Sequence, residues 1–184
     1  MKPLKTKNFI LTPMETEGLN PENFIWSYVW SISFIETGRD IGTVSFKSPP
    51  ENGTVELVME AVSFEEEALK AVINWAFTQK GVYFVETISP YFSSEFLSMG
   101  FYAVSADKYE LEKQPSSFTS IYMSLFLGVG LCFGTAFKNT ALGLCFGVAI
   151  GLCLGSAMDA DDKKKRTEFK EAKRHNIHNE NNEP

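Results

Sequence analysis

The chain has 184 residues, with 17 Lys plus Arg against 23 Asp plus Glu and a formal net charge of -6. Residues 1–115 hold 9 of the basic and 16 of the acidic side chains, and this net charge of -7, without a basic cluster, argues against nucleic-acid binding. The histidines are His175 and His178, and the cysteines are Cys132, Cys145 and Cys153. Residues 1–115 therefore lack the side chains of a Ser/His/Asp triad, a Cys nucleophile or a Cys/His zinc site, and we expect no metal.

Strand-like patterns dominate the first 62 residues of the chain. The expected strands are residues 8–11, 27–36, 41–46 and 54–62. Pro13 is expected to end the first strand, and the polar residues 14–23 should form a loop or a short helix. Turn-forming residues at 37–40 and 49–53 separate the next three strands, so these strands predict an antiparallel meander.

Helices and strands alternate after this meander. The expected elements are a helix over residues 63–81, a strand over 82–88, a short helix over 90–99 and a final strand or hairpin over 101–111. Ser63 is the expected N-cap of the first helix, whose opening turn contains three glutamates at residues 65–67. This order predicts an α+β domain over residues 1–115, a mixed and mostly antiparallel sheet with flanking helices.

Two apolar segments follow a short linker at residues 114–117. Residues 118–137 and residues 140–158 contain no charged side chain. Twenty helical residues span about 30 Å, the thickness of the hydrocarbon core of a bilayer. We therefore expect a transmembrane hairpin over residues 116–158; the alternative is a buried helical hairpin of a soluble protein, whose helices seldom lack a polar face for so long.

Glycines recur at intervals of four along both apolar segments. The stripe consists of Gly130 and Gly134 in the first segment and of Gly143, Gly147, Gly151 and Gly155 in the second. Such spacing places the glycines on one helix face, where another helix can approach closely. The partner is either the other helix of the hairpin or a second copy of the chain, which would form a glycine-zipper homo-oligomer.

Residues 159–184 are hydrophilic and are expected to form a charged, disordered tail. The tail contains the basic run Lys163, Lys164, Lys165 and Arg166 directly after the second apolar segment. By the positive-inside rule this run places the tail in the cytoplasm, and two spans return the N-terminal domain to the same side. The same four charges are candidates for contact with anionic lipid headgroups at the membrane surface.

Several motifs of the N-terminal domain are similar to one enzyme family. The sequences IGTVSFK at residues 41–47, PENGTVEL at 50–57, ALKAVINWAF at 68–77 and SMGF at 98–101 occur in this order. Together they resemble the GNAT acetyltransferases, in particular the branch that acetylates ribosomal-protein N-termini. The resemblance covers residues 4–112 and implies a GNAT-like fold, with acetyl-CoA as the cofactor if the domain is active.

The sequence departs from the family at the segment that holds the cofactor's pyrophosphate. Active members carry Arg/Gln-x-x-Gly-x-Gly/Ala before the long helix, where backbone N–H groups and the helix N-terminus bind the phosphates. Residues 57–67 contain no Gly, Arg or Lys and end in three glutamates, which repel a pyrophosphate. These glutamates are also ordinary for the first turn of any helix, so we assign no cofactor-binding residue.

Glu56 is the candidate catalytic residue under this resemblance. It lies where such enzymes often carry a strand carboxylate that acts as general base towards an amine. The alternative is an outward-facing glutamate on a strand, without a catalytic role.

Three functions remain open from the sequence. The first is a membrane-tethered, catalytically degenerate GNAT-like domain that acts as a binding or regulatory module for a protein partner that the sequence does not name. The second is an active N-acetyltransferase, which would need splayed strands at residues 54–62 and 82–88 to hold acetyl-CoA. The third is an oligomeric membrane protein in which the N-terminal domain forms a cytoplasmic cap.

Overall fold

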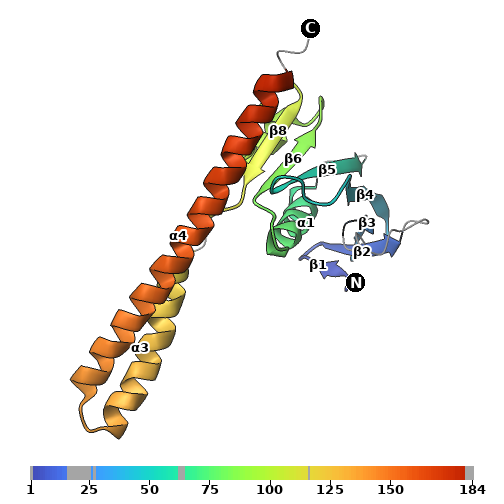
Figure 1. Cartoon of the computed structure of the whole chain (residues 1–184). Helices are drawn as coiled ribbons and strands as arrows, with labels where there is room; N and C mark the ends of the chain where they lie inside the picture. The colour runs from blue at the N-terminus through green and yellow to red at the C-terminus, as the bar shows by residue number, and fades with distance from the viewer. Residues whose placement is uncertain (1, 16–25, 27, 62–64, 116, 181–184) are drawn as a thin grey trace. The chain divides into compact units, whose positions relative to one another are not determined.

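The computed structural model describes residues 2–15, 26, 28–61, 65–115 and 117–180 (Figure 1). The chain divides into two compact units, unit 1 (Met1–Lys113) and unit 2 (Gln114–Pro184). The boundary between them lies at the start of the linker that the sequence predicts. Two predicted features lie outside the described residues, the N-cap at Ser63 and most of the polar stretch at 14–23.

Unit 1 is built on one sheet, which has eight strands among the described residues, in the order β1-β2-β3-β4-β5-β6-β8-β7. The strands are β1 (Leu4–Lys5), β2 (Phe9–Glu15), β3 (Tyr28–Phe34), β4 (Asp40–Phe46), β5 (Thr54–Ala61), β6 (Phe84–Ile88), β7 (Tyr102–Ala103) and β8 (Lys108–Glu112). Neighbouring strands are antiparallel except β5 and β6, which are parallel because α1 (Glu66–Thr78) connects them as a crossover helix. The sheet is mixed and mostly antiparallel with flanking helices, which confirms the predicted α+β class.

The strand expected at residues 8–11 is β2, which is longer than the sequence suggests. β2 continues through Pro13 to Glu15, and Pro13 pairs with Trp30 of β3. β1 pairs with β2 only at Ile10 and Leu11. At Pro13, the edge of β2 that faces away from β3 therefore has no partner among the described strands, and a residue without an N–H group is tolerated there. The expectation that Pro13 ends the strand is therefore wrong.

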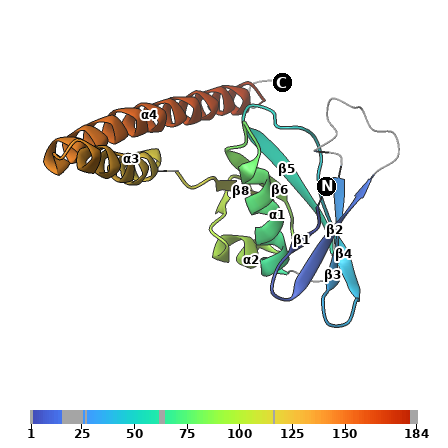
Figure 2. The ribbon, with the colours of Figure 1, turned by 90° about the horizontal axis from the view of Figure 1, so that it is seen from below.

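The core of unit 1 lies on one face of the sheet. Helix α1 buries its face of Ala68, Leu69, Val72, Ile73 and Ala76, and both views place this helix alongside the strands (Figures 1 and 2). Helix α2 (Ser93–Ser98) adds Phe96, whose ring stacks on that of Tyr109 of β8 at a centroid distance of 5.7 Å. Because side chains alternate along each strand, the residues between these core positions project from the opposite face.

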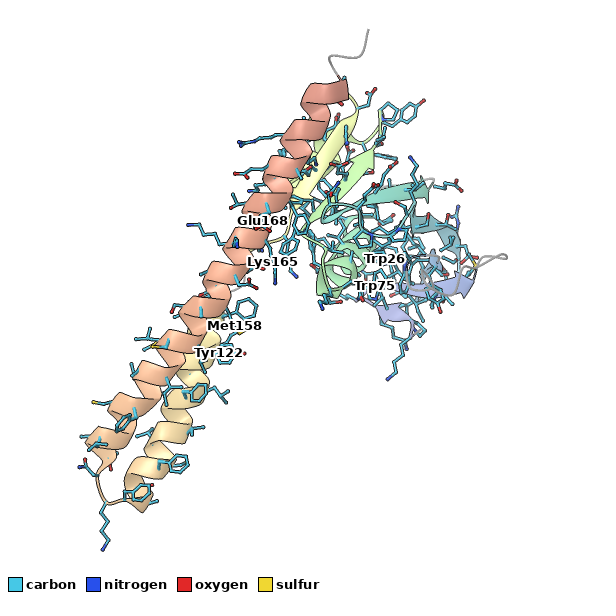
Figure 3. The ribbon with its side chains drawn as sticks, viewed as in Figure 1. Trp26, Trp75, Tyr122, Met158, Lys165 and Glu168 are labelled. Carbon is cyan, nitrogen blue, oxygen red and sulfur yellow. The ribbon has the colours of Figure 1, made fainter. Side chains whose placement is uncertain are left out.

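All three tryptophans of the chain belong to this core. The ring of Trp75 on α1 lies 5.6 Å from that of Trp26 and 5.4 Å from that of Trp30, measured between centroids (Figure 3). Phe46 completes the cluster, 5.4 Å from Trp26. The rings contact each other directly, so the cluster is a packed joint between α1 and the sheet, and its fluorescence reports on unit 1 alone.

Unit 2 is a hairpin of two long helices, α3 (Phe118–Ala136) and α4 (Thr140–Glu180). The turn between them is tight: Lys138 has a positive φ of 55°, and the Asn139 side chain accepts a hydrogen bond from Leu142 N at 3.1 Å. Both helices are long and apolar enough to cross a membrane. At 19 residues, α3 is about 28 Å long.

Helix α4 does not end with its apolar part. It continues to Glu180, which differs from the disordered tail expected from residue 159 onwards. Ion pairs at a spacing of four residues support the polar part of the helix, between Lys165 and Asp161 at 2.6 Å and between Arg166 and Asp162 at 2.9 Å. A hydrophilic composition alone therefore gave the wrong expectation, because the opposite charges are spaced to stabilise a helix.

Candidate functional site

The parallel strands β5 and β6 stop pairing before β5 ends. The last pair joins Leu57 to Thr87, whereas β5 continues for four residues to Ala61, hydrogen-bonded on its other side to β4. Ile88, the last residue of β6, pairs only with β8 among the described strands. Among the described residues, β5 thus extends beyond its pairing with β6, and residues 58–61 of β5 have no strand partner on that edge.

Helix α1 begins at the same end of the sheet. Its N-cap is Glu65 instead of the expected Ser63, and the Glu65 side chain makes no capping hydrogen bond. Glu66 in the first turn forms an ion pair with Lys70. The connection at residues 62–64 lies outside the described residues. Because the first turn contributes two carboxylates and the N-cap a third, the negative charge expected from the sequence is located at the helix end where a phosphate would bind.

Glu67 has a specific partner that the sequence did not indicate. Its carboxylate accepts hydrogen bonds from the backbone N–H groups of Lys7 at 2.5 Å and Asn8 at 3.1 Å, and from the Asn8 amide at 2.7 Å. A hydrogen bond from the Thr6 hydroxyl, together with these backbone and amide donors, lowers the pKa of Glu67. Glu67 therefore ties α1 to the turn between β1 and β2, and its charge is part of the fold.

Glu56, the candidate base, lies on β5 with its side chain partly exposed. Both of its carboxylate oxygens accept hydrogen bonds from Lys47 Nζ, at 3.1 and 3.0 Å. A base that abstracts a proton from an amine needs a free lone pair directed at that amine. In this structure the carboxylate of Glu56 instead accepts hydrogen bonds from the ammonium group of Lys47.

The strand register places Glu56 in a row of carboxylates that the sequence analysis missed. Glu56 is the partner of Glu86 on β6, and Glu86 is the partner of Glu110 on β8, so the three side chains share the face opposite α1. Lys108 forms an ion pair with Glu86 at 2.7 Å, and the Tyr102 hydroxyl donates to Glu110. Period-two alternation within each strand was visible in the sequence, but only the register brings the three positions together.

The glycine stripe lies at the interface between α3 and α4. A Cβ atom on Gly151 would lie 2.8 Å from Met123 Cα, and one on Gly134 would lie 2.8 Å from Thr140 Cα. Cβ atoms on the other four, Gly130, Gly143, Gly147 and Gly155, would also approach the backbone of the facing helix too closely. The six glycines are thus used in packing the two helices of one chain against each other.

A polar contact joins the two helices at the end opposite the turn. Asp159 of α4 accepts hydrogen bonds from the backbone N–H groups of Phe118 at 2.7 Å and Thr119 at 3.1 Å, and from the Thr119 hydroxyl at 2.6 Å. Asp159 thereby caps the N-terminus of α3 from the neighbouring helix. Tyr122 and Met158, which lie close to this contact in the sequence, mark the same end of the hairpin in Figure 3.

The basic run expected at the membrane surface is largely paired along α4. Lys165 and Arg166 bond to Asp161 and Asp162, and Lys164 lies 3.9 Å from Glu168; Lys165 and Glu168 are labelled in Figure 3. Within the described part of the chain, Lys163 has no ion-pair partner. In the same part, no three His, Cys, Asp or Glu side chains form a group suited to a metal ion.

The chain is similar to several solved structures. It is 10% identical to a GNAT-family acetyltransferase from Bacillus anthracis (TM-score 0.45; 60% of this chain and 98% of the other). It is 14% identical to the N-terminal domain of a ribosomal-protein-alanine acetyltransferase from Clostridium acetobutylicum (TM-score 0.44; 60% and 95%) and 16% identical to an acetyltransferase from Agrobacterium tumefaciens (TM-score 0.44; 61% and 95%). No protein-family model and no curated protein matches the sequence.

Proposed function

We propose that this chain is a membrane-tethered, GNAT-like domain that does not transfer acetyl groups and acts as a binding or regulatory module. The observation that carries the proposal is the N-terminus of α1. Glu65, Glu66 and Glu67 surround the helix end that would bind a pyrophosphate, and Glu67 is held there by the turn at Lys7 and Asn8. A phosphate at this end would meet like charges that the fold itself retains.

A titration of CoA and acetyl-CoA into the purified full chain tests this loss of cofactor binding. We expect no heat of binding at millimolar ligand, measured at two stated salt concentrations because the ligand is a polyanion. Tryptophan fluorescence serves as the folding control, since the Trp26, Trp30 and Trp75 cluster reports on unit 1. Micromolar binding by the folded protein would contradict the proposal.

An active N-acetyltransferase is the second candidate, favoured by the early end of the β5–β6 pairing at Leu57 and Thr87. In that case acetyl-CoA would bind between the two strands, and Glu56 would act as base once an incoming amine displaced Lys47. Acetyl transfer to peptide N-termini would then fall steeply in Glu56→Gln and persist in Glu60→Gln, which changes the next carboxylate on the same face of β5. Equal activity in both variants would remove Glu56 from the mechanism.

Membrane tethering rests on the apolar parts of α3 and α4. Each is long enough to span the hydrocarbon core, and the hairpin brings both ends of the pair back to one side. We propose two spans, with unit 1 and the polar part of α4 in the cytoplasm. Protease added outside sealed cells should leave tags at both termini intact, whereas cleavage of either tag would contradict this topology.

Self-association through the glycine stripe is a weaker proposal. The stripe is occupied within the hairpin, so a second copy would need to separate α3 from α4 or use another face. Cross-linking of the full chain in mild detergent measures its oligomeric state directly. A stable oligomer that Gly147→Leu abolishes would favour the glycine-zipper function over the binding module.

A further inference from the structure

A recess lies inside unit 2, at the end of the hairpin opposite the turn. It has a volume of about 460 Å³. Its walls are formed by Pro115, Ser117, Asp159, Asp162, Lys163 and Arg166. On α4 these residues occupy one face, because positions 159, 162, 163 and 166 are separated by three or four residues.

The position of the recess along the hairpin suggests its environment. The apolar part of α3 begins at Phe118 and that of α4 ends at Met158, so the recess adjoins the last residues that would lie in hydrocarbon. If the hairpin spans the membrane as proposed above, the recess lies at the level of the lipid headgroups. The inference rests on that tethering.

The two acidic residues of the recess are both engaged by other groups. Asp159 accepts three hydrogen bonds from the first residues of α3, which place the positive end of that helix against its carboxylate. Asp162 accepts a hydrogen bond from Arg166 Nε at 2.9 Å. Both carboxylates therefore have donors within the protein, and each keeps its negative charge.

The two cations of the recess differ in their partners. Arg166 donates to Asp162 and to the carbonyl oxygen of Gln114, the latter at 3.1 Å, which holds its guanidinium at the recess. Lys163 has no ion-pair partner among the described residues, unlike Lys164 and Lys165. Ser117 also lines the recess, and its hydroxyl, a further hydrogen-bond group, lies 2.8 Å from the hydroxyl of Ser120.

We propose that this recess binds the phosphate group of an anionic phospholipid headgroup. Lys163 supplies a positive charge that has no ion-pair partner among the described residues, Arg166 adds a second cation, and the Ser117 hydroxyl donates a hydrogen bond to a phosphate oxygen. Cationic side chains at the cytoplasmic ends of membrane helices suit this chemistry. The basic run thus acts through one defined site instead of a uniformly charged surface.

The test compares Lys163→Gln with Lys164→Gln in the full chain. Both variants remove one positive charge, but Lys164 is outside the recess and lies beside Glu168. Native mass spectrometry of the protein in mild detergent, titrated with phosphatidylglycerol, measures the affinity for the lipid. We expect about fivefold weaker binding in Lys163→Gln, and a change well below that in Lys164→Gln, since one lysine near an anionic surface contributes on that scale.

The other outcomes overturn the inference. Equal losses in both variants would mean attraction to the whole basic run, and equal binding of phosphatidylcholine would mean that the charge of the headgroup is irrelevant. Displacement of the lipid by millimolar inorganic phosphate would reassign the recess to free phosphate. Extraction of the wild-type chain from vesicles by alkaline carbonate separates a failure of membrane tethering from a failure of this site.

Discussion

The two units of this chain achieve close packing in opposite ways. In unit 1 the contact between α1 and the sheet is made by the largest side chains available, with Trp30 fully buried against Trp75. In unit 2, α3 and α4 pack against each other at six glycines, where the lack of a side chain lets the two backbones approach closely. The difference matches the solvent expected for each unit: water rewards burial of large apolar area, whereas in lipid only close approach of the backbones gains contact.

The largest expected effect comes from the core of unit 1. Trp30 has no exposed surface, so Trp30→Ala should lower the free energy of unfolding by about 3–5 kcal/mol. Urea unfolding followed by the fluorescence of the remaining tryptophans measures this loss. Far-UV circular dichroism at the wavelength of helices should show that the α3–α4 hairpin persists after unit 1 unfolds; simultaneous loss of both signals would mean that the two units are not independent.

The corresponding change in unit 2 adds a side chain instead of removing one. A Cβ atom at position 143 would lie 2.5 Å from Gly134 Cα, so Gly143→Leu should force the helices apart and cost about 1–3 kcal/mol of hairpin stability. Gly128→Leu is the matched control, because a Cβ at Gly128 meets nothing within 4 Å. Denaturation in mixed micelles, followed by circular dichroism, should separate the two variants.

Equal behaviour of these two glycine variants would contradict the packing of α3 against α4 at the glycines. Tryptophan fluorescence should be unchanged in both, because every tryptophan lies in unit 1. A shift in that signal for Gly143→Leu alone would show that the state of the hairpin is transmitted to unit 1.

Glu67, whose hydrogen-bond partners lie far away in the sequence, also stabilises unit 1. This effect is smaller and depends on pH. Hydrogen bonds, first from Thr6 and then from Asn8 and Lys7, lower the pKa of Glu67 below its ordinary value of 4.5. Glu67 therefore contributes stability that is complete above pH 4.5 and is lost as the pH falls through the lowered pKa. The Tm of the wild type should exceed that of Glu67→Gln at pH 7, and the difference should shrink towards pH 3. A difference independent of pH would assign the effect to shape instead of charge.

The sequence was sufficient for the architecture of unit 1. Strand alternation and the helical spacing of Leu69, Val72 and Ile73 predicted the sheet and its crossover helix, because local periodicity reflects which face is buried. The apolar hairpin followed from composition in the same way. The continuation of β2 through Pro13 could not be predicted in this way. Whether a strand needs an N–H donor at the position of Pro13 depends on the strand that lies beside it, and not on the proline itself.

The candidate site was predictable only in part. The glutamates of α1 were visible in the sequence. The hydrogen bonds that Glu67 accepts from Lys7 and Asn8, however, join positions about sixty residues apart and need the fold. The alignment of Glu56, Glu86 and Glu110 needs the strand register for the same reason. Local patterns determine which face a side chain occupies, and tertiary pairing determines which side chains it meets.

The smallest expected effect concerns the turn of the hairpin. Lys138 occupies the left-handed region at φ 55°, where a side chain costs roughly 1–2 kcal/mol that glycine avoids. Part of this gain is offset because glycine loses more backbone freedom on folding, so Lys138→Gly should stabilise the hairpin by about 1 kcal/mol or less. Lys138→Ala removes the same charge but keeps a Cβ atom, and it should not stabilise the turn. If both variants raise the midpoint of micellar denaturation equally, the cost at this position arises from placing a cation at the membrane surface, and backbone strain is not its source.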